Sequence, residues 1–150
     1  MKLLSFLACF TASALAQRIA IGAPARFSTV ARGSNITVEV DKPNALTGSK
    51  DIAIVIGLVS CNGHEKNECA SFDVTQVVGQ ILYSGPYKPQ YETQQPGVPF
   101  KPPYQNFTVQ VPATFQKGQA SLSVSHFSLV GAGPYPFLDV QNTTLIVQSA

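Results

Sequence analysis

Two cysteines, Cys61 and Cys69, are the residues of this sequence best placed to react with one another. They bracket a short polar segment, CNGHEKNEC, while the third cysteine, Cys9, lies near the amino terminus. In an oxidising compartment an even pair at this spacing is expected to form a disulfide, which would stabilise the fold by roughly 2.5 kcal/mol. The alternative is a zinc site of Cys61, His64 and Cys69, which offers three ligands where structural zinc sites use four.

Side chains for acid–base or nucleophilic catalysis are few and scattered. The histidines are His64 and His126, and no Gly-x-Ser-x-Gly motif is present. We expect His126 to be a partly buried, hydrogen-bonded structural residue rather than a general base. A copper site at an amino-terminal histidine is excluded if Gln17 is the first mature residue. The carboxylates are dispersed, so we expect no enzyme, no cofactor and no metal; they include Asp51, Asp73 and Asp139.

A segment rich in proline and tyrosine, residues 83–105, is the best candidate for contact with another molecule. Its prolines cannot belong to a central strand or a helix, so we expect a long, partly polyproline-like loop. Tyrosines give a large, stiff contact area, suited to a protein groove or to stacking on a sugar. The alternative is a loop that covers a sheet edge. The candidate partner-binding residues are Tyr83, Tyr87, Tyr91 and Tyr104.

Three Asn-x-Thr sequons are candidate N-glycosylation sites, each at or near the start of a predicted strand. They begin at Asn35, Asn106 and Asn142. An exposed asparagine at such a position could carry a sugar in a secreted protein. The alternative at each site is an unmodified asparagine.

The first 16 residues have the pattern of a secretory signal peptide. Lys2 precedes an apolar run, and Ala14-Leu15-Ala16 matches a cleavage site, which we place after Ala16. No later run is long enough to span a membrane, so we expect a secreted protein. At about 134 residues the mature chain should form a single domain, residues 17–150, and we expect it to be a monomer. Nine basic and eight acidic residues remain after Lys2 is removed, and this balance argues against nucleic-acid or anionic-membrane binding.

Short segments of alternating or branched residues predict an all-β fold. Asp51–Val59 has no polar face, which indicates a central strand covered on both sides. Gln119–Gly131 alternates and then changes phase after His126, which suggests a β-bulge, or passage into a region covered on both sides. The other predicted strands are Arg18–Val30 (one strand, or two broken at Pro24), Asn35–Asp41, Val74–Tyr83, Asn106–Val111 and Phe137–Val147.

Seven or eight such strands predict an antiparallel immunoglobulin-like β-sandwich, with a small β-barrel as the alternative. The sequence contains no Trp and its cysteines are close together. It therefore lacks the antibody-type core, in which a Trp packs against an inter-sheet disulfide.

An ordered series of short motifs resembles the necrosis-inducing secreted proteins of plant-associated fungi. The series starts with Asp51-Ile52-Ala53-Ile54, Val78-Gly79 and Tyr83-x-Gly85-Pro86. It continues through residues 112–118 and Phe127-Ser128-Leu129, and ends with Gly131-Ala132 and the 142–147 strand.

The resemblance implies a secreted, non-enzymatic effector of plant immunity. Such proteins suppress pattern-triggered immunity by binding a co-receptor kinase and a receptor-associated cytoplasmic kinase, and some provoke cell death when overproduced in leaves. The resemblance also leaves uptake into the host cytoplasm open. The Cys61–Cys69 loop and the long proline–tyrosine segment depart from the family pattern, so a carbohydrate-binding or cell-wall protein that uses residues 83–105 remains the alternative.

Overall fold

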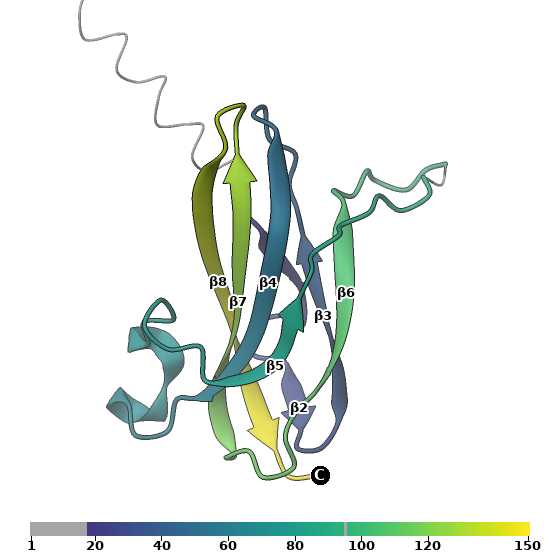
Figure 1. Cartoon of the computed structure of the whole chain (residues 1–150). Helices are drawn as coiled ribbons and strands as arrows, with labels where there is room; N and C mark the ends of the chain where they lie inside the picture. The colour runs from purple at the N-terminus through teal and green to yellow at the C-terminus, as the bar shows by residue number, and fades with distance from the viewer. Residues whose placement is uncertain (1–17, 95) are drawn as a thin grey trace, which may run out of the picture.

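The structure, a computed structural model, describes residues 18–94 and 96–150, and the predicted signal peptide with its cleavage site lies outside these residues. Eight strands form two stacked layers (Figure 1). The strands are β1 (Ala20–Ala23), β2 (Thr29–Ala31), β3 (Asn35–Asp41), β4 (Ser49–Ser60), β5 (Gln80–Gly85), β6 (Tyr104–Gln110), β7 (Gly118–Val130) and β8 (Tyr135–Gln148). Two single-turn 3-10 helices, η2 (Glu65–Asn67) and η3 (Cys69–Ser71), lie between β4 and β5.

The strand order is that of an immunoglobulin-like β-sandwich, as predicted. One sheet has the order β1-β3-β6, and the other has the order β2-β8-β7-β4-β5. If β1 is strand A, the first sheet corresponds to strands A, B and E and the second contains G, F and C. All pairs are antiparallel except β2 with β8, which is parallel. The chain crosses from one sheet to the other between β1 and β2, at Pro24, where the sequence predicts a break.

Most strands lie where the sequence patterns place them, with one clear exception. The predicted strand Val74–Tyr83 is wrong in its first half, because β5 begins only at Gln80. Gly79 has a positive φ of 75° and lies against the backbone of Leu58, where an added Cβ would collide. The segment before Gly79 therefore crosses over β4, with Val78 against Gly57, and forms no strand beside it.

The predicted change of face after His126 in β7 is also wrong. The pairing of β7 with β8 runs without interruption, and Ser128 and Val130 are buried on the same face as His126. The register shift lies opposite, in β4, between Asp51 and Ala53. This bulge turns Asp51 toward the interior, next to His126. The alternation of apolar and polar residues along β7 is interrupted because His126 and Ser128, both polar, face the interior there.

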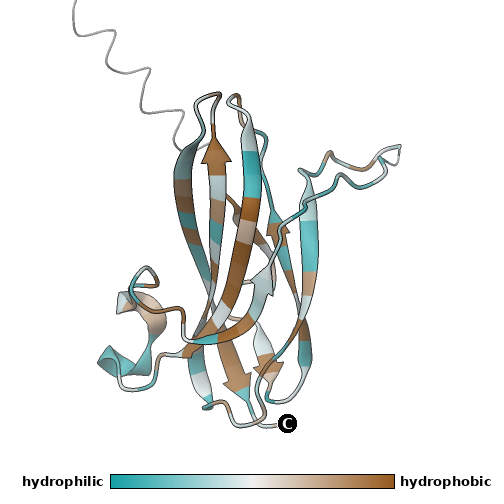
Figure 2. Cartoon of the chain, in the orientation of Figure 1, coloured by the Kyte–Doolittle hydropathy of each residue, from teal (hydrophilic) through white to brown (hydrophobic). Residues whose placement is uncertain are grey.

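The core lies between the two sheets and is mainly aliphatic, with three buried aromatic residues, Tyr87, Phe107 and Phe115. Figure 2 shows hydrophobic residues as bands along β4 and β7. Ile56 and Leu122 are 0 % exposed and face Val38 of the other sheet's central strand within one cluster. Burial of such side chains stabilises the sandwich by ~2 kcal/mol each.

The predicted disulfide between Cys61 and Cys69 is formed, with Cα atoms 5.2 Å apart. It holds η2 and η3 against the outer face of the five-stranded sheet, where the Cys69 N–H donates to Gln119 Oε1 at 3.1 Å. Both sulfur atoms are bonded to one another, so the alternative zinc site with His64 is wrong.

Replacement of both cysteines, Cys61→Ser with Cys69→Ser, is expected to lower the free energy of unfolding by roughly 2.5 kcal/mol, because the unfolded chain gains the entropy of the opened loop. Chemical denaturation with and without reductant measures it. The wild type should become less stable in reductant and the double variant should not change. Equal stability of the wild type and the double variant in the absence of reductant would contradict the prediction.

Candidate functional site

The predicted proline–tyrosine loop is an arm that extends from the sandwich between β5 and β6 (Figure 1). We define the arm as residues 86–103, of which residue 95 is not described. Its base is fixed by two backbone hydrogen bonds between Gln90 and Tyr104, of 2.9 and 3.0 Å. The Lys88 N–H also donates to Gln105 Oε1 at 2.7 Å. The base of the arm is therefore held in one position relative to the sheets.

The four tyrosines predicted to bind a partner occupy different environments. Tyr87 is 3 % exposed and belongs to the core, where its hydroxyl donates to the Val40 carbonyl at 3.1 Å. Burial, with smaller effects from Asp51 and Asp41, raises the pKa of this hydroxyl. Tyr83 packs on Phe107 and Tyr104 lies beneath Lys101, and both are half-buried.

Only Tyr91, of these four tyrosines, presents most of its side chain to solvent, at 56 % exposure. Its ring lies 5.6 Å from that of Phe100, which is 65 % exposed, and its hydroxyl donates to Asn44 Oδ1 at 2.7 Å. Sequence reasoning missed Phe100. The alternation of prolines with aromatic residues includes this residue, and the pairing of the two branches of the arm brings it to Tyr91.

A hollow of about 440 Å³ lies between the arm and the loop that joins β3 to β4. Tyr91, Lys88 and Asn44 line its walls, and Asp51 lies in its floor. Polar groups and an aromatic ring in one open hollow suit a peptide or a sugar better than a purely apolar ligand.

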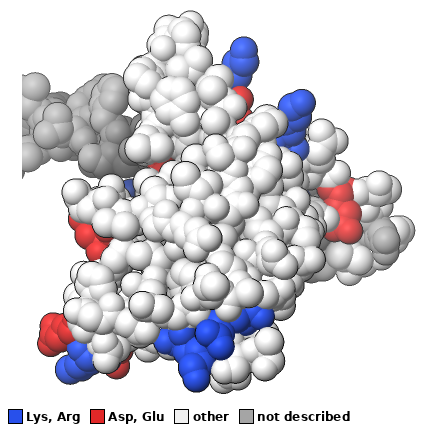
Figure 3. All heavy atoms as spheres, turned by 60° about the horizontal axis from the view of Figure 1, so that its bottom comes forward, with Lys and Arg blue, Asp and Glu red and all other residues white. Residues whose placement is uncertain are grey.

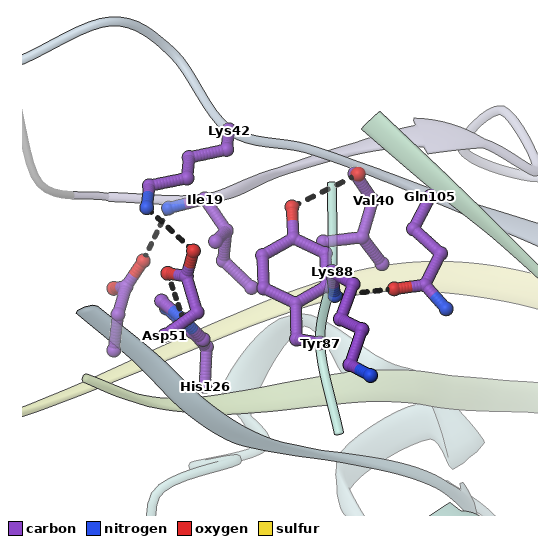
Figure 4. Close-up of polar contacts among 9 residues, drawn as sticks. Ile19, Val40, Lys42, Asp51, Tyr87, Lys88, Gln105 and His126 are labelled. Atoms are coloured by element: carbon purple, nitrogen blue, oxygen red, sulfur yellow. Dashed lines mark hydrogen bonds and ion pairs between the residues drawn. The ribbon is translucent and has the colours of Figure 1, made fainter. Parts of the chain in front are cut away.

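Beneath the hollow, Asp51 joins two basic side chains (Figure 4). The Lys42 ammonium donates to Asp51 Oδ2 at 2.6 Å, and His126 Nε2 lies 3.0 Å from Asp51 Oδ1. A carboxylate oxygen only accepts, so Nε2 carries the hydrogen of this bond. His126 is 1 % exposed and its ring meets that of Tyr87 edge-on at 5.1 Å. His126 is therefore hydrogen bonded, as predicted, but almost fully buried rather than partly buried. It links Asp51 in the floor of the hollow to Tyr87 at the base of the arm.

Burial alone would raise the pKa of Asp51, but hydrogen bonds from His126 and Lys42 and the charge of Lys42 hold it below its ordinary value of 3.8. The ionised form is thus favoured in the folded state. Its contribution to stability is present above pH 3.8 and is lost as the pH falls through the lower, folded-state pKa.

Asp51→Asn is expected to lower the free energy of unfolding by ~2 kcal/mol at pH 7, because Lys42 loses its ionic partner and His126 its charged acceptor. The difference from the wild type should shrink as the pH falls below 3.8. Urea denaturation across this pH range measures both effects. Glu92→Gln, an exposed carboxylate on the arm, is the control and should leave the profile unchanged. An Asp51→Asn profile parallel to that of the wild type at every pH would rule the prediction out.

The three sequon asparagines are all exposed. Asn35 on β3 and Asn106 on β6 face outward from the three-stranded sheet, since they alternate with buried residues such as Val38 and Phe107. Asn142 lies on β8 and donates to Ser121 Oγ at 3.1 Å. Each of the three positions can therefore present an attached sugar to solvent.

Other kinds of site find little support among the described residues. Within residues 18–94 and 96–150, no three His, Cys, Asp or Glu side chains are grouped to hold a metal ion. The same residues include no helix long and apolar enough to cross a membrane. Asp73 lies on an exposed turn, where it accepts hydrogen bonds from Thr75. Asp139 is buried opposite His126 in the register of β7 and β8, and it accepts from the Ile19 N–H at 2.8 Å.

The fold and the site together define a small, disulfide-bonded, immunoglobulin-like β-sandwich that carries an exposed aromatic arm. In a comparison with family models, the chain matches the Nis1 family over residues 14–146. This match spans nearly the whole chain, and the chain belongs to the Nis1 family, by its name a fungal necrosis-inducing, effector-type family. No curated protein matches the chain.

Solved structures resemble the chain in fold. A superoxide reductase (neelaredoxin) from Ignicoccus hospitalis has a TM-score of 0.51 and 16 % identity over 99 % of this chain and 100 % of its own. At this identity the likeness concerns the fold alone. A cellulose-active polysaccharide monooxygenase from M. thermophila has a TM-score of 0.46 and 10 % identity, over 84 % of this chain and 55 % of its own, and supports no inference.

Proposed function

We propose that this chain is a secreted effector-type interaction protein that suppresses plant immunity by binding immune receptor-associated kinases. It acts by occupying a surface of the kinase rather than by turning over a substrate. The same binding, at high expression, induces cell death in leaves. Membership of the Nis1 family supports the effector role, and the signal-peptide pattern of the first 16 residues supports secretion.

The observation that carries the proposed mode of action is the exposed aromatic pair of the arm. Tyr91 and Phe100 together offer two large rings at the surface. Aromatic residues, Phe included, are enriched in protein interfaces, and Tyr is among the residues most enriched in binding hot spots. The prolines of the arm restrict the backbone, which lowers the entropy lost on binding. A stiff arm with two rings suits a groove on a folded protein domain.

Affinity purification from leaf tissue that expresses the tagged chain tests the proposal. Immune receptor-associated kinases should be enriched over a tagged secreted protein of the same size, and the pattern-triggered oxidative burst should be weaker in the same leaves. A chain that accumulates in the leaf without enriching any kinase, and without altering the burst, would refute it.

The second candidate is a carbohydrate-binding or cell-wall protein that uses the arm. The observation in its favour is the hollow beside Tyr91, which combines the ring with polar side chains such as Asn44 and Lys88. Pull-down on insoluble chitin, glucan and cellulose separates the two candidates. Retention on one polysaccharide that is lost in Tyr91→Ala would favour the second candidate, and passage through all three would exclude it.

A further inference from the structure

The third sequon, at Asn142, lies beside a hollow on the outer face of the five-stranded sheet, which we call the Asn142 hollow. It measures about 300 Å³, and Arg26, Phe72, Asn142 and Thr144 are among the residues that line it. Asn142 and Thr144 belong to β8, which lies between β2 and β7. Arg26 precedes β2, and Phe72 follows η3, which contacts β7. The hollow therefore has β8 as its floor and a wall on each side.

Both walls of the Asn142 hollow are held by bonds within the protein. On the side of β2, the Phe27 N–H donates to the Thr144 carbonyl at 2.6 Å, and the Arg26 guanidinium lies 4.8 Å from the centre of the Phe27 ring. On the other side the disulfide holds η3, and the Phe72 N–H donates to the Cys69 carbonyl at 3.1 Å. The shape of the hollow is therefore largely preformed, as is usual for binding sites.

The side chain of Asn142 is directed along the floor of this hollow. Its Nδ2 donates to Ser121 Oγ at 3.1 Å, and Ser121 is the neighbour of Thr144 in the register of β7 and β8. The amide thus reaches from its own position toward that of Thr144. Nδ2 is the atom that carries the sugar in an N-glycan, and it keeps one N–H after the sugar is attached. That N–H can stay bonded to Ser121 while the sugar begins over the floor.

The walls offer the contacts that a pyranose sugar uses. Phe72 is only half-buried, and the negative face of an aromatic ring attracts the C–H groups of a sugar ring. Arg26 carries five N–H donors, which suit the hydroxyl groups and the acetamido carbonyl of N-acetylglucosamine. Within residues 18–94 and 96–150, no ion pair involves Arg26. Its guanidinium therefore has donors to give to a sugar.

A neutral sugar fits the charge of this surface better than an anionic ligand does. Arg26 is the one charged side chain among the described residues that line the Asn142 hollow. Figure 3 shows a largely uncharged surface on the face that it presents, with charged side chains in small separate groups. Strong attraction of anions needs several basic groups around one cleft. The lining thus favours an uncharged, hydrogen-bonding occupant.

The other two sequons have different surroundings. Asn35 and Asn106 lie on the outer face of the three-stranded sheet, where their neighbours across the strands are Gln110 and Glu39. A sugar attached at either position projects from the face of a sheet. These two asparagines are therefore internal controls for Asn142.

We propose that the first N-acetylglucosamine of an N-glycan on Asn142 occupies the Asn142 hollow as part of the folded structure. Its ring packs on Phe72 and its oxygen atoms accept hydrogen bonds from Arg26, while the later sugars extend toward solvent. Attachment forms a bond between Nδ2 and C1 of the sugar, breaks the bond from C1 to the diphosphate of the lipid-linked donor, and releases one Nδ2 proton. The inference does not depend on kinase binding.

Site-resolved deglycosylation of the protein secreted by a eukaryotic host tests the inference. Peptide N-glycosidase converts a glycosylated asparagine to aspartate, so mass spectrometry of peptides gives the rate of release at each sequon. At Asn142 release from the native protein should be at least ~tenfold slower than from the denatured, reduced chain, because the sugar must first leave the hollow. The native rate should be reduced less at Asn35 and Asn106, wherever these carry a glycan.

Phe72→Ala removes one wall and should restore most of the rate of native release at Asn142. Tyr135→Ala, which removes an exposed aromatic ring at the start of β8, is the matched control and should leave that rate unchanged. Thermal unfolding confirms that the variants fold, and Arg26→Ala replaces Phe72→Ala if the latter does not. An endoglycosidase that leaves one N-acetylglucosamine on each asparagine prepares a sample for NMR, in which nuclear Overhauser effects should connect this sugar to the Phe72 ring.

Three results would overturn the inference. The first is an Asn142 that carries no glycan in the secreted protein. The second is native release at Asn142 that is as fast as from the denatured chain, or that is slow but does not change in the folded wall variant. The third is a sugar on Asn142 that shows no nuclear Overhauser effect to the Phe72 ring.

Discussion

The double substitution Tyr91→Ala with Phe100→Ala is expected to weaken binding to an immune receptor-associated kinase by ~100-fold while leaving the fold intact. The two rings lie 5.6 Å apart at the surface of the arm and belong to no buried cluster. Truncation of a paired aromatic hot spot removes at least ~2 kcal/mol of binding free energy. Surface plasmon resonance with the kinase immobilised measures the change.

Tyr135→Ala is the matched control for the arm. Tyr135 is 50 % exposed, close to the 56 % of Tyr91, but begins β8 outside the arm. It should bind as the wild type does. If the double variant of the arm also binds as the wild type does, the arm is not the contact surface.

Tyr87→Ala is expected to lower the free energy of unfolding by ~4 kcal/mol. Tyr87 lies in the same proline–tyrosine segment as Tyr91, but its side chain belongs to the core. The ring is almost fully buried between Phe107 and His126, and its removal leaves a cavity that a sandwich cannot close. Tyr87→Phe keeps the ring and loses only the hydrogen bond to Val40, so we expect a loss of ~1 kcal/mol. Guanidinium denaturation gives both values.

Tyr91→Ala serves as the comparison for the stability series. Its side chain is mostly in solvent, so the free energy of unfolding should change by less than ~0.5 kcal/mol. A Tyr87→Ala variant no less stable than Tyr91→Ala would mean that Tyr87 is not part of the core in solution.

The strands could be predicted where local pattern decides the structure. Asn35–Asp41 alternates without interruption between turn residues, and β3 has these same bounds. Val74–Gly79 has equally strand-like residues but lies across β4, because Gly57 and Gly79 permit a close crossing that sequence alone does not reveal. Local propensity is overridden where the backbone packs against another strand.

The site was only partly predictable, because contacts between residues distant in sequence decide which side chains are buried. Tyr87 and Tyr91 lie in one loop, and each has a proline one or two residues before it. Tyr87 is nevertheless in the core, whereas Tyr91 is mostly exposed to solvent. Which of them turns inward depends on Phe107 and His126, which are distant in sequence. The Asp51–His126 pair was not predicted either, since it requires the bulge in β4 that brings Asp51 to the inner face.

Titration of kinase activity with the purified chain tests most directly the claim that this protein acts by occupying a partner. The kinase should be held well above its dissociation constant for the chain, and substrate phosphorylation measured against the molar ratio of chain to kinase. We predict that inhibition grows in proportion to the added chain and saturates near one chain per kinase. Full inhibition by a small fraction of an equivalent would indicate turnover, and no inhibition at large excess would show that the kinase is not the partner; either result would contradict the claim.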